Sequence, residues 1–197
     1  VLLDWLSEGK EHWRSSVINF TRNWLKEGLI DRAVTRDLDW GIEIPREGYE
    51  NKRMYVWFEA VMGYYSASVH WAKNQGKPEE WKKWWENEDS EHYYFMAKDN
   101  IPFHTIIWPA MLSGCGYKLP YDVPANEYLL LDSSQFSKSR RHAIWIPDYL
   151  DRYDPELLRF YLASIMPEQK DANFTWEDYV TRINTELIGN YGNLMYR

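Results

Sequence analysis

Residues 92–116 read HYYFMAKDNIPFHTIIWPAMLSGCG. The aromatic run from His92 to Ala97 predicts a buried strand, and the apolar pattern from Ile101 to Leu112 predicts a helix directly after it. Asp99 stands between them. In an open parallel sheet, ligands lie beyond the carboxyl ends of the strands, where an acidic side chain can bind ribose hydroxyls. The same carboxylate could instead cap the helix, so both interpretations stay open at this point.

Glycine and proline positions set the expected ends of the helices. Pro109 should kink the helix or mark its last turn, and Gly114 and Gly116 should end it. Further helices are expected over Gly63–Lys73, in a short segment after Pro78, and in an amphipathic segment with Trp13, Val17, Phe20 and Trp24 on one face that Gly28 can close.

Two more strands are expected, over Met54–Phe58 and Glu127–Leu131. Strands that alternate with helices predict an α/β domain with a parallel sheet. A polar loop from Asp132 to Arg141 should follow the last strand. From about residue 146 we expect an all-helical tail, with a helix start at Asp154-Pro155, a capping box from Thr175 to Asp178, and a long helix through Val180 and Leu194.

The composition excludes several classes of protein. Asp and Glu number 30 and Lys and Arg 23, and a net charge of −7 argues against binding nucleic acid through the overall field. One cysteine, Cys115, excludes an internal disulfide framework and a cysteine-rich zinc cluster. No apolar run approaches the roughly 20 residues that span a bilayer. We therefore expect a soluble protein of a reducing compartment, the cytoplasm.

A set of aromatic side chains is a candidate binding site. His104 and Trp108 are neighbours on one helix face, and Trp57 leads toward Tyr64. Such a slot suits a flexible apolar side chain, and sulfur packs well against aromatic rings. On spacing alone, however, aromatic residues at helical intervals are more often core. The candidate set is Trp57, Tyr64, Phe103, His104 and Trp108.

The segment from Phe136 to His142 is a candidate anion-binding loop. It reads FSKSRRH and holds Lys138, Arg140, Arg141 and His142 within five residues. Lysine is a compact, mobile cation that suits polyphosphate, although a solvated basic loop is the simpler interpretation. Neither common glycine-rich phosphate loop occurs in the sequence.

Four stretches of the chain together resemble the methionyl-tRNA synthetase family of class I aminoacyl-tRNA synthetases, of the archaeal and eukaryotic type. They occur in the family's order and spacing, and the last is similar to the family's KMSKS signature. The stretches are TRDLDWG (35–41), YVWFEAVMGY (55–64), FMAKDNIPFHTIIWPAM (95–111) and QFSKSR (135–140).

The resemblance implies a methionine–tRNA ligase, which uses ATP with Mg²⁺ to activate methionine and then transfers it to tRNA(Met). It implies a catalytic role for Lys138 on the departing pyrophosphate. It also implies ATP contacts from Asp99 and Ser137, and anticodon contacts from Asn193 and Arg197. By the same resemblance, the signature loop is Gln135, Phe136, Ser137, Lys138 and Ser139, and the methionine pocket is formed or backed by Trp57, Ala60, Tyr64, Phe103, His104 and Trp108.

The family's other signature, H-x-G-H, does not occur in this sequence, and neither do its zinc-knuckle cysteines. The resemblance therefore implies the second half of a Rossmann-like (HUP-type) sheet, with no metal or zinc site in this chain. The isolated chain should be inactive without the N-terminal half of the catalytic domain. The expected organisation is part of the connective insert and the second catalytic half over 1–145, a stem-contact region over 146–174, and the first helix of the anticodon-binding bundle over 175–197.

The chain departs from the family pattern at Gln135, Arg141, Ala97 and Glu59. These stand for the usual lysine, glycine, glycine and aspartate, respectively. Two alternatives stay open: another class I synthetase, such as the cysteine, leucine or isoleucine enzyme, or a non-catalytic tRNA-binding or interaction module derived from a synthetase.

Overall fold

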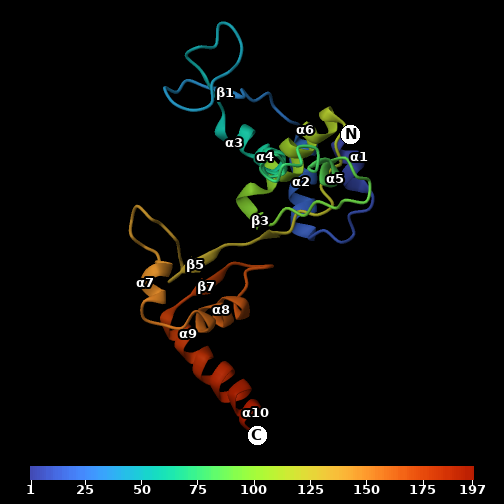
Figure 1. Ribbon diagram of the computed structural model, residues 1–197. Helices are drawn as coiled ribbons and strands as arrows, with labels where there is room; N and C mark the ends of the chain where they lie inside the picture. The colour runs from blue at the N-terminus through green and yellow to red at the C-terminus, as the bar shows by residue number, and fades with distance from the viewer. The chain divides into compact units, whose positions relative to one another are not determined.

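A computed structural model describes residues 1–197, which form two compact units, Val1–Ala125 and Asn126–Arg197 (Figure 1). Both units combine helices with short strands, so the predicted α/β class is confirmed. The strands belong to three small sheets rather than to one wide sheet. No helix has both the length and the apolar character needed to cross a bilayer.

The first unit begins with α1 (Leu2–Ser7) and α2 (Ser15–Glu27), and α2 ends at Gly28 with φ 94°. The face of α2 that enters the core holds Val17 and Thr21, both fully buried. Phe20, expected on that face, is 41% exposed. The prediction was wrong there because the helix begins only after Trp13, so Val17 and Thr21, one turn apart, define the buried stripe.

The predicted strand over residues 54–58 is mostly helix. Only β2 (Arg53–Met54) is extended, and it pairs antiparallel with β1 (Thr35–Arg36). A helical turn, α3 (Val56–Ala60), follows at once. A continuous apolar run predicts a strand when both faces of the strand are buried. Here Val56 and Trp57 are 57% and 47% exposed, so that condition is not met.

Two helices then carry three of the tryptophans of the first unit, Trp71, Trp84 and Trp85. The helix expected over 63–73 is confirmed as α4 (Gly63–Asn74). The one expected after Pro78 is only a turn, α5 (Lys82–Trp85). Rings of these helices pack edge to face, Tyr65 on Trp81 and on Trp85 at centroid distances of 5.1 and 5.4 Å. This cluster reaches the candidate aromatic set, because Trp85 contacts Trp108 edge to face at 5.9 Å.

The segment over 92–116 contains the predicted strand and helix. Its extended part ends in β3 (Met96–Ala97), which pairs with β4 (Ala125–Asn126), and a parallel bridge joins Tyr93 to Asp122. The helical part is η1 (Lys98–Asn100), a π-helical stretch η2 (Phe103–Ile107) and α6 (Trp108–Cys115).

Pro109 lies in the first turn of α6, not in the last turn of the helix. Proline has no N–H to give to the preceding turn, and the widened π turn just before it accommodates that loss. Gly114 lies inside α6, so it does not end the helix. The helix ends at Gly116 instead, whose φ is 74°.

The second unit holds a three-stranded sheet of order β6-β5-β7. β5 (Leu129–Leu131) runs antiparallel to β6 (Ser134–Gln135) and parallel to β7 (Ala172–Phe174). Two expectations are therefore wrong. The segment expected to be a polar loop over residues 132–141 contains the strand β6, because Asp132 and Ser133 take the positive φ angles of a tight turn that pairs β6 with β5. The tail is not all-helical, because β7 completes the sheet.

Two helices precede β7, namely α7 (Ile146–Leu150) and α8 (Pro155–Ser164). The predicted start of α8 is confirmed, since the Asp154 carboxylate accepts a hydrogen bond from the Glu156 N–H at 2.8 Å. Tyr161 of α8 and Phe174 of β7 are both buried and contact edge to face at 5.2 Å. This contact holds the helix on the sheet.

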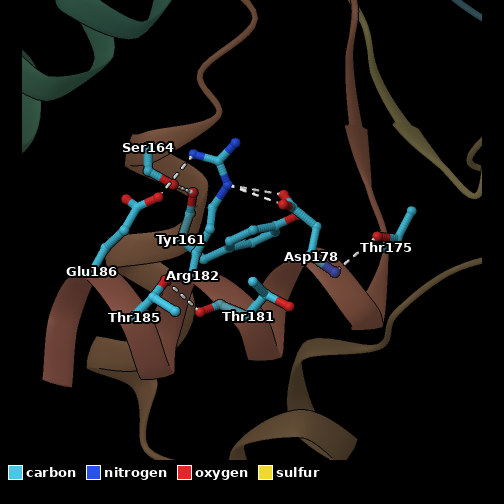
Figure 2. A network of polar contacts seen from close by, with 8 residues as sticks. All are labelled: Tyr161, Ser164, Thr175, Asp178, Thr181, Arg182, Thr185 and Glu186. Atoms are coloured by element: carbon cyan, nitrogen blue, oxygen red, sulfur yellow. Dashed lines mark hydrogen bonds and ion pairs between the residues drawn. The ribbon is translucent and has the colours of Figure 1, made fainter. Parts of the chain in front are cut away.

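The chain ends in one long helix made of α9 (Trp176–Arg182), a π-helical stretch η3 (Ile183–Gly192) and α10 (Asn193–Tyr196) (Figure 1). The Thr175 hydroxyl accepts from the Asp178 N–H at 3.1 Å, so the predicted cap is confirmed. The Asp178 carboxylate does not complete a capping box. It accepts from Tyr161 and from Arg182 instead (Figure 2).

Candidate functional site

The aromatic residues singled out in the sequence come together in the first unit. The Tyr64 hydroxyl, from α4, lies 2.8 Å from Nε2 of His104 in η2. The other ring nitrogen of His104 lies 3.0 Å from the Asn100 carbonyl oxygen. A carbonyl only accepts, so Nδ1 carries the hydrogen, and in the neutral ring Nε2 accepts from Tyr64. Burial lowers the pKa of His104, which favours this neutral form.

The members of the set lie at different depths. Trp57 and Phe103 stack with centroids 5.3 Å apart and planes 25° from parallel. Trp57 is 47% exposed and Tyr64 43%, whereas His104 and Trp108 are 6% and 4% exposed. Ala60 is also exposed. Trp57 and Tyr64 therefore form an accessible rim, and His104 and Trp108 form its buried floor.

Tyr94 belongs to this set, although sequence reasoning missed it. Its hydroxyl accepts a hydrogen bond of 2.9 Å from the Trp108 indole N–H. Its ring contacts Tyr64 and His104 at centroid distances of 5.0 and 5.7 Å. Burial raises the pKa of Tyr94 to about 12, so the hydroxyl stays neutral. The alternation of exposed Tyr93 and buried Tyr94 has the period of a strand and could have indicated it.

Asp99 lies in η1 directly after β3, with its side chain exposed. Its carboxylate accepts from the Asn100 side-chain amide at 3.2 Å. Neither η1 nor η2 has a side-chain cap at its start, so the interpretation of Asp99 as a cap of the following helix is wrong. An exposed carboxylate at the end of a strand is available to hydroxyl donors.

The loop that carries Lys138 is a hairpin within the second unit. Ser137 and His142 exchange backbone hydrogen bonds of 2.9 and 3.0 Å, which close a turn of four residues. Gln135 ends β6, Phe136 lies just before the closing residue Ser137, and Ser139 lies within the turn. The Lys138 side chain is exposed. Asp99 belongs to the other unit.

Asn193 and Arg197 lie one turn apart at the end of the last helix, and both are exposed. The Asn193 side-chain amide donates to the Gly189 carbonyl at 2.9 Å, which leaves its oxygen as an acceptor. Polar side chains at this spacing point from one helix face and could meet one base edge.

Comparison with known proteins identifies the family of the chain. The sequence profile of the family described as "tRNA synthetases class I (M)" matches residues 1–197. The chain belongs to the methionyl-tRNA synthetase family. A methionine–tRNA ligase from Dehalococcoides mccartyi is 57% identical over 197 residues, which is 100% of this chain and 35% of that protein. One from Thermomicrobium roseum is 55% identical over 192 residues, which is 96% of this chain and 33% of that protein.

The chain thus spans about a third of the length of these synthetase relatives. Among solved structures, Mycobacterium tuberculosis methionyl-tRNA synthetase bound by methionyl-adenylate matches with a TM-score of 0.77 and 24% identity. The match covers 98% of this chain and 36% of that one. At this identity the structural likeness supports the fold.

Proposed function

We propose that this chain supplies the methionine-binding and pyrophosphate-binding parts of a methionine–tRNA ligase. The reaction joins the methionine carboxylate to the α-phosphorus of ATP and releases pyrophosphate, and then transfers the methionyl group to a terminal ribose hydroxyl of tRNA(Met) and releases AMP. The observation that carries the proposal is the Tyr64–His104 hydrogen bond on a buried aromatic floor, in a chain of this family. The relatives' names favour methionine over the other class I substrates and over a non-catalytic module.

The pocket residues have different roles in binding the methionine side chain. The stacked rings of Trp57 and Phe103 offer a flat apolar wall, with Ala60 leaving room beside it, and thioether sulfur packs favourably against such rings. His104 and Tyr64 satisfy each other's polar atoms, so an apolar ligand enters without leaving them unpaired. Trp108 lies behind the pocket, in the core, and is held there by the hydrogen bond that it donates to Tyr94.

Each unit carries exposed side chains that suit a part of ATP. The exposed Asp99 carboxylate suits the two hydroxyls of ribose. The Lys138 ammonium, with the Ser137 hydroxyl beside it, suits the charge that develops on pyrophosphate as it leaves. Asp99 lies directly after the strand β3, and this position supports a Rossmann-like half-sheet. Mg²⁺ would arrive bound to the phosphates of ATP, as is usual for this ion.

The domain bounds in this proposal are those expected from the sequence. Residues 1–145 are part of the connective insert and the second catalytic half, 146–174 contact the tRNA stem, and 175–197 begin the anticodon-binding bundle. Asn193 and Arg197 would read an anticodon base. Completion of the active site would require the H-x-G-H segment, which this chain does not contain.

The test is methionine-dependent ATP–pyrophosphate exchange by the full-length protein that contains this chain. Lys138→Ala should lower kcat by about a hundred-fold or more while the methionine KM changes little, because the cation acts mainly on the transition state. Lys170→Ala removes an exposed lysine elsewhere in the second unit and serves as the matched control. Near wild-type turnover by the Lys138 variant would leave the loop as a solvated basic turn.

A further inference from the structure

The hairpin that carries Lys138 is fastened by one side chain, that of His142. Its Nε2 lies 2.8 Å from the Leu131 carbonyl oxygen, eleven residues back in the sequence. Leu131 is the last residue of β5 and is buried. Since a carbonyl oxygen only accepts, Nε2 must carry the hydrogen and donate it. The loop is thereby tied to the sheet.

The same residue also closes the turn through its backbone. The His142 N–H donates to the Ser137 carbonyl at 3.0 Å, and the Ser137 N–H donates to the His142 carbonyl at 2.9 Å. Lys138 directly follows Ser137, so a single peptide bond joins its backbone to the closed pair. The position of its ammonium therefore depends on where this pair is held.

Within the turn the backbone has little other support. The Arg141 N–H donates to the Lys138 carbonyl at 3.1 Å. The Arg140 N–H lies 3.3 Å from the Ser137 hydroxyl, a long contact. Arg141 has φ 55°, a left-handed conformation that costs a non-glycine residue free energy. Such a conformation persists only when neighbouring contacts hold it, and the His142 anchor is the nearest one.

We propose that His142 is a positioning residue, which places Lys138 for pyrophosphate release by tying the closed end of its hairpin to Leu131. The proposal rests on the proposed function. It predicts a loss that appears in kcat rather than in methionine binding, because methionine contacts lie in the other unit.

The experiment compares variants of the full-length protein in methionine-dependent ATP–pyrophosphate exchange. His142→Ala should lower kcat by about ten-fold or more and leave the methionine KM within about two-fold, since small misplacements of a catalytic group are costly. His142→Gln places an amide N–H near the position of Nε2 and should restore most of kcat. His12→Ala is the matched control, because His12 Nε2 also contacts a backbone carbonyl, that of Tyr121 at 2.9 Å.

Two further readouts separate positioning from general stability. In a Lys138→Ala background, adding His142→Ala should have no further effect on kcat, because the group it positions is gone. Trypsin should cleave the His142→Ala protein faster after Lys138, Arg140 and Arg141, as the turn opens, and the Gln variant should resist as the wild type does.

The outcomes are distinguishable. Unchanged kcat in His142→Ala, or losses that add independently in the double variant, would overturn the positioning role while leaving the proposed function intact. Wild-type kcat in Lys138→Ala would instead overturn the proposed function of the loop, and with it this inference. If His142→Ala fails to fold, the Gln variant decides: near wild-type kcat supports the anchor, and a ten-fold loss contradicts it.

Discussion

Tyr64 donates a hydrogen bond of 2.8 Å to Nε2 of His104, and this direction of the hydrogen bond requires a neutral ring at the pocket floor. Nδ1 of the same ring is committed to the Asn100 carbonyl. A protonated ring would have to reverse the Tyr64 hydrogen bond and hold a charge at 6% exposure. The floor is therefore neutral near physiological pH, as suits an apolar ligand.

The first prediction follows from this neutrality. Burial depresses the pKa of His104 below the value of 6.5 that it has when unfolded. The unfolded chain therefore takes up the proton first, so stability is full above that value and is lost as pH falls through the folded pKa. Urea unfolding of the 197-residue chain between about pH 7.5 and about pH 5 should show a steeper loss in the wild type than in His104→Asn.

His70→Asn is the control for that measurement, because His70 is exposed and its ring contacts only Asn74 at 2.9 Å in α4. It should keep the wild-type slope. A His104→Asn slope equal to that of the wild type would show that the ring is already charged or solvated in the folded chain.

The second prediction concerns the different depths of the pocket residues. Trp57→Ala in the full-length protein should raise the methionine KM about ten-fold or more with a small change in stability, because the ring is half exposed. Trp108→Ala should instead cost about 3–5 kcal/mol in the free energy of unfolding, since the ring is buried. Exchange kinetics and thermal unfolding measure the two effects.

Trp40→Ala removes a ring that is 81% exposed and should change neither quantity. Equal changes in the methionine and ATP KM values of Trp57→Ala would contradict its assignment to the methionine pocket.

The sequence was most informative where one local contact determines the structure. The caps at Asp154 and Thr175 need only a side chain and a nearby N–H, so they could be read from the residues. The residues of the candidate pocket could be singled out because they lie in two short stretches, 57–64 and 103–108. Tyr94 was missed because its partner, the Trp108 indole, comes from the helix after it, and that contact depends on how strand and helix pack.

Long-range pairing explains the remaining errors. β7 is three residues long and is a strand only because β5 lies parallel to it, with Leu129 opposite Ala172. Nothing in its own sequence distinguishes it from a loop between helices. The reverse error occurred at Val56–Ala60, where a run typical of a strand is helical because no partner strand is present there.

The third prediction concerns the polar network on the last helix (Figure 2). The Tyr161 hydroxyl donates to Asp178 at 2.9 Å, and the Arg182 Nε donates to the same carboxylate at 2.9 Å. Asp178→Ala should lower the free energy of unfolding by about 2 kcal/mol, because it leaves the buried tyrosine without an acceptor. Tyr161→Phe should cost about 1 kcal/mol, since it removes only the hydroxyl.

Glu186→Ala is the control within the same network. Its ion pair with Arg182 spans 3.6 Å between half-exposed side chains, so its loss should change stability by less than about 0.5 kcal/mol. Chemical unfolding of the four chains ranks them. If the Asp178 variant were no less stable than the Glu186 variant, α8 would be held to the last helix by apolar packing alone.

The fourth prediction tests the strain at Arg141, whose φ of 55° lies in the left-handed region. Arg141→Gly removes the steric cost of that conformation, about 1–2 kcal/mol, but adds freedom to the unfolded chain, which offsets roughly 0.5–1 kcal/mol. The net change should be a gain below about 1 kcal/mol. Arg141→Val should destabilise the chain, because a β-branched side chain crowds its own backbone at positive φ. Thermal unfolding of both variants gives the sign, and trypsin cleavage after Lys138 reports the turn itself. A valine variant as stable as the glycine variant would show that the backbone at this position is not left-handed in solution.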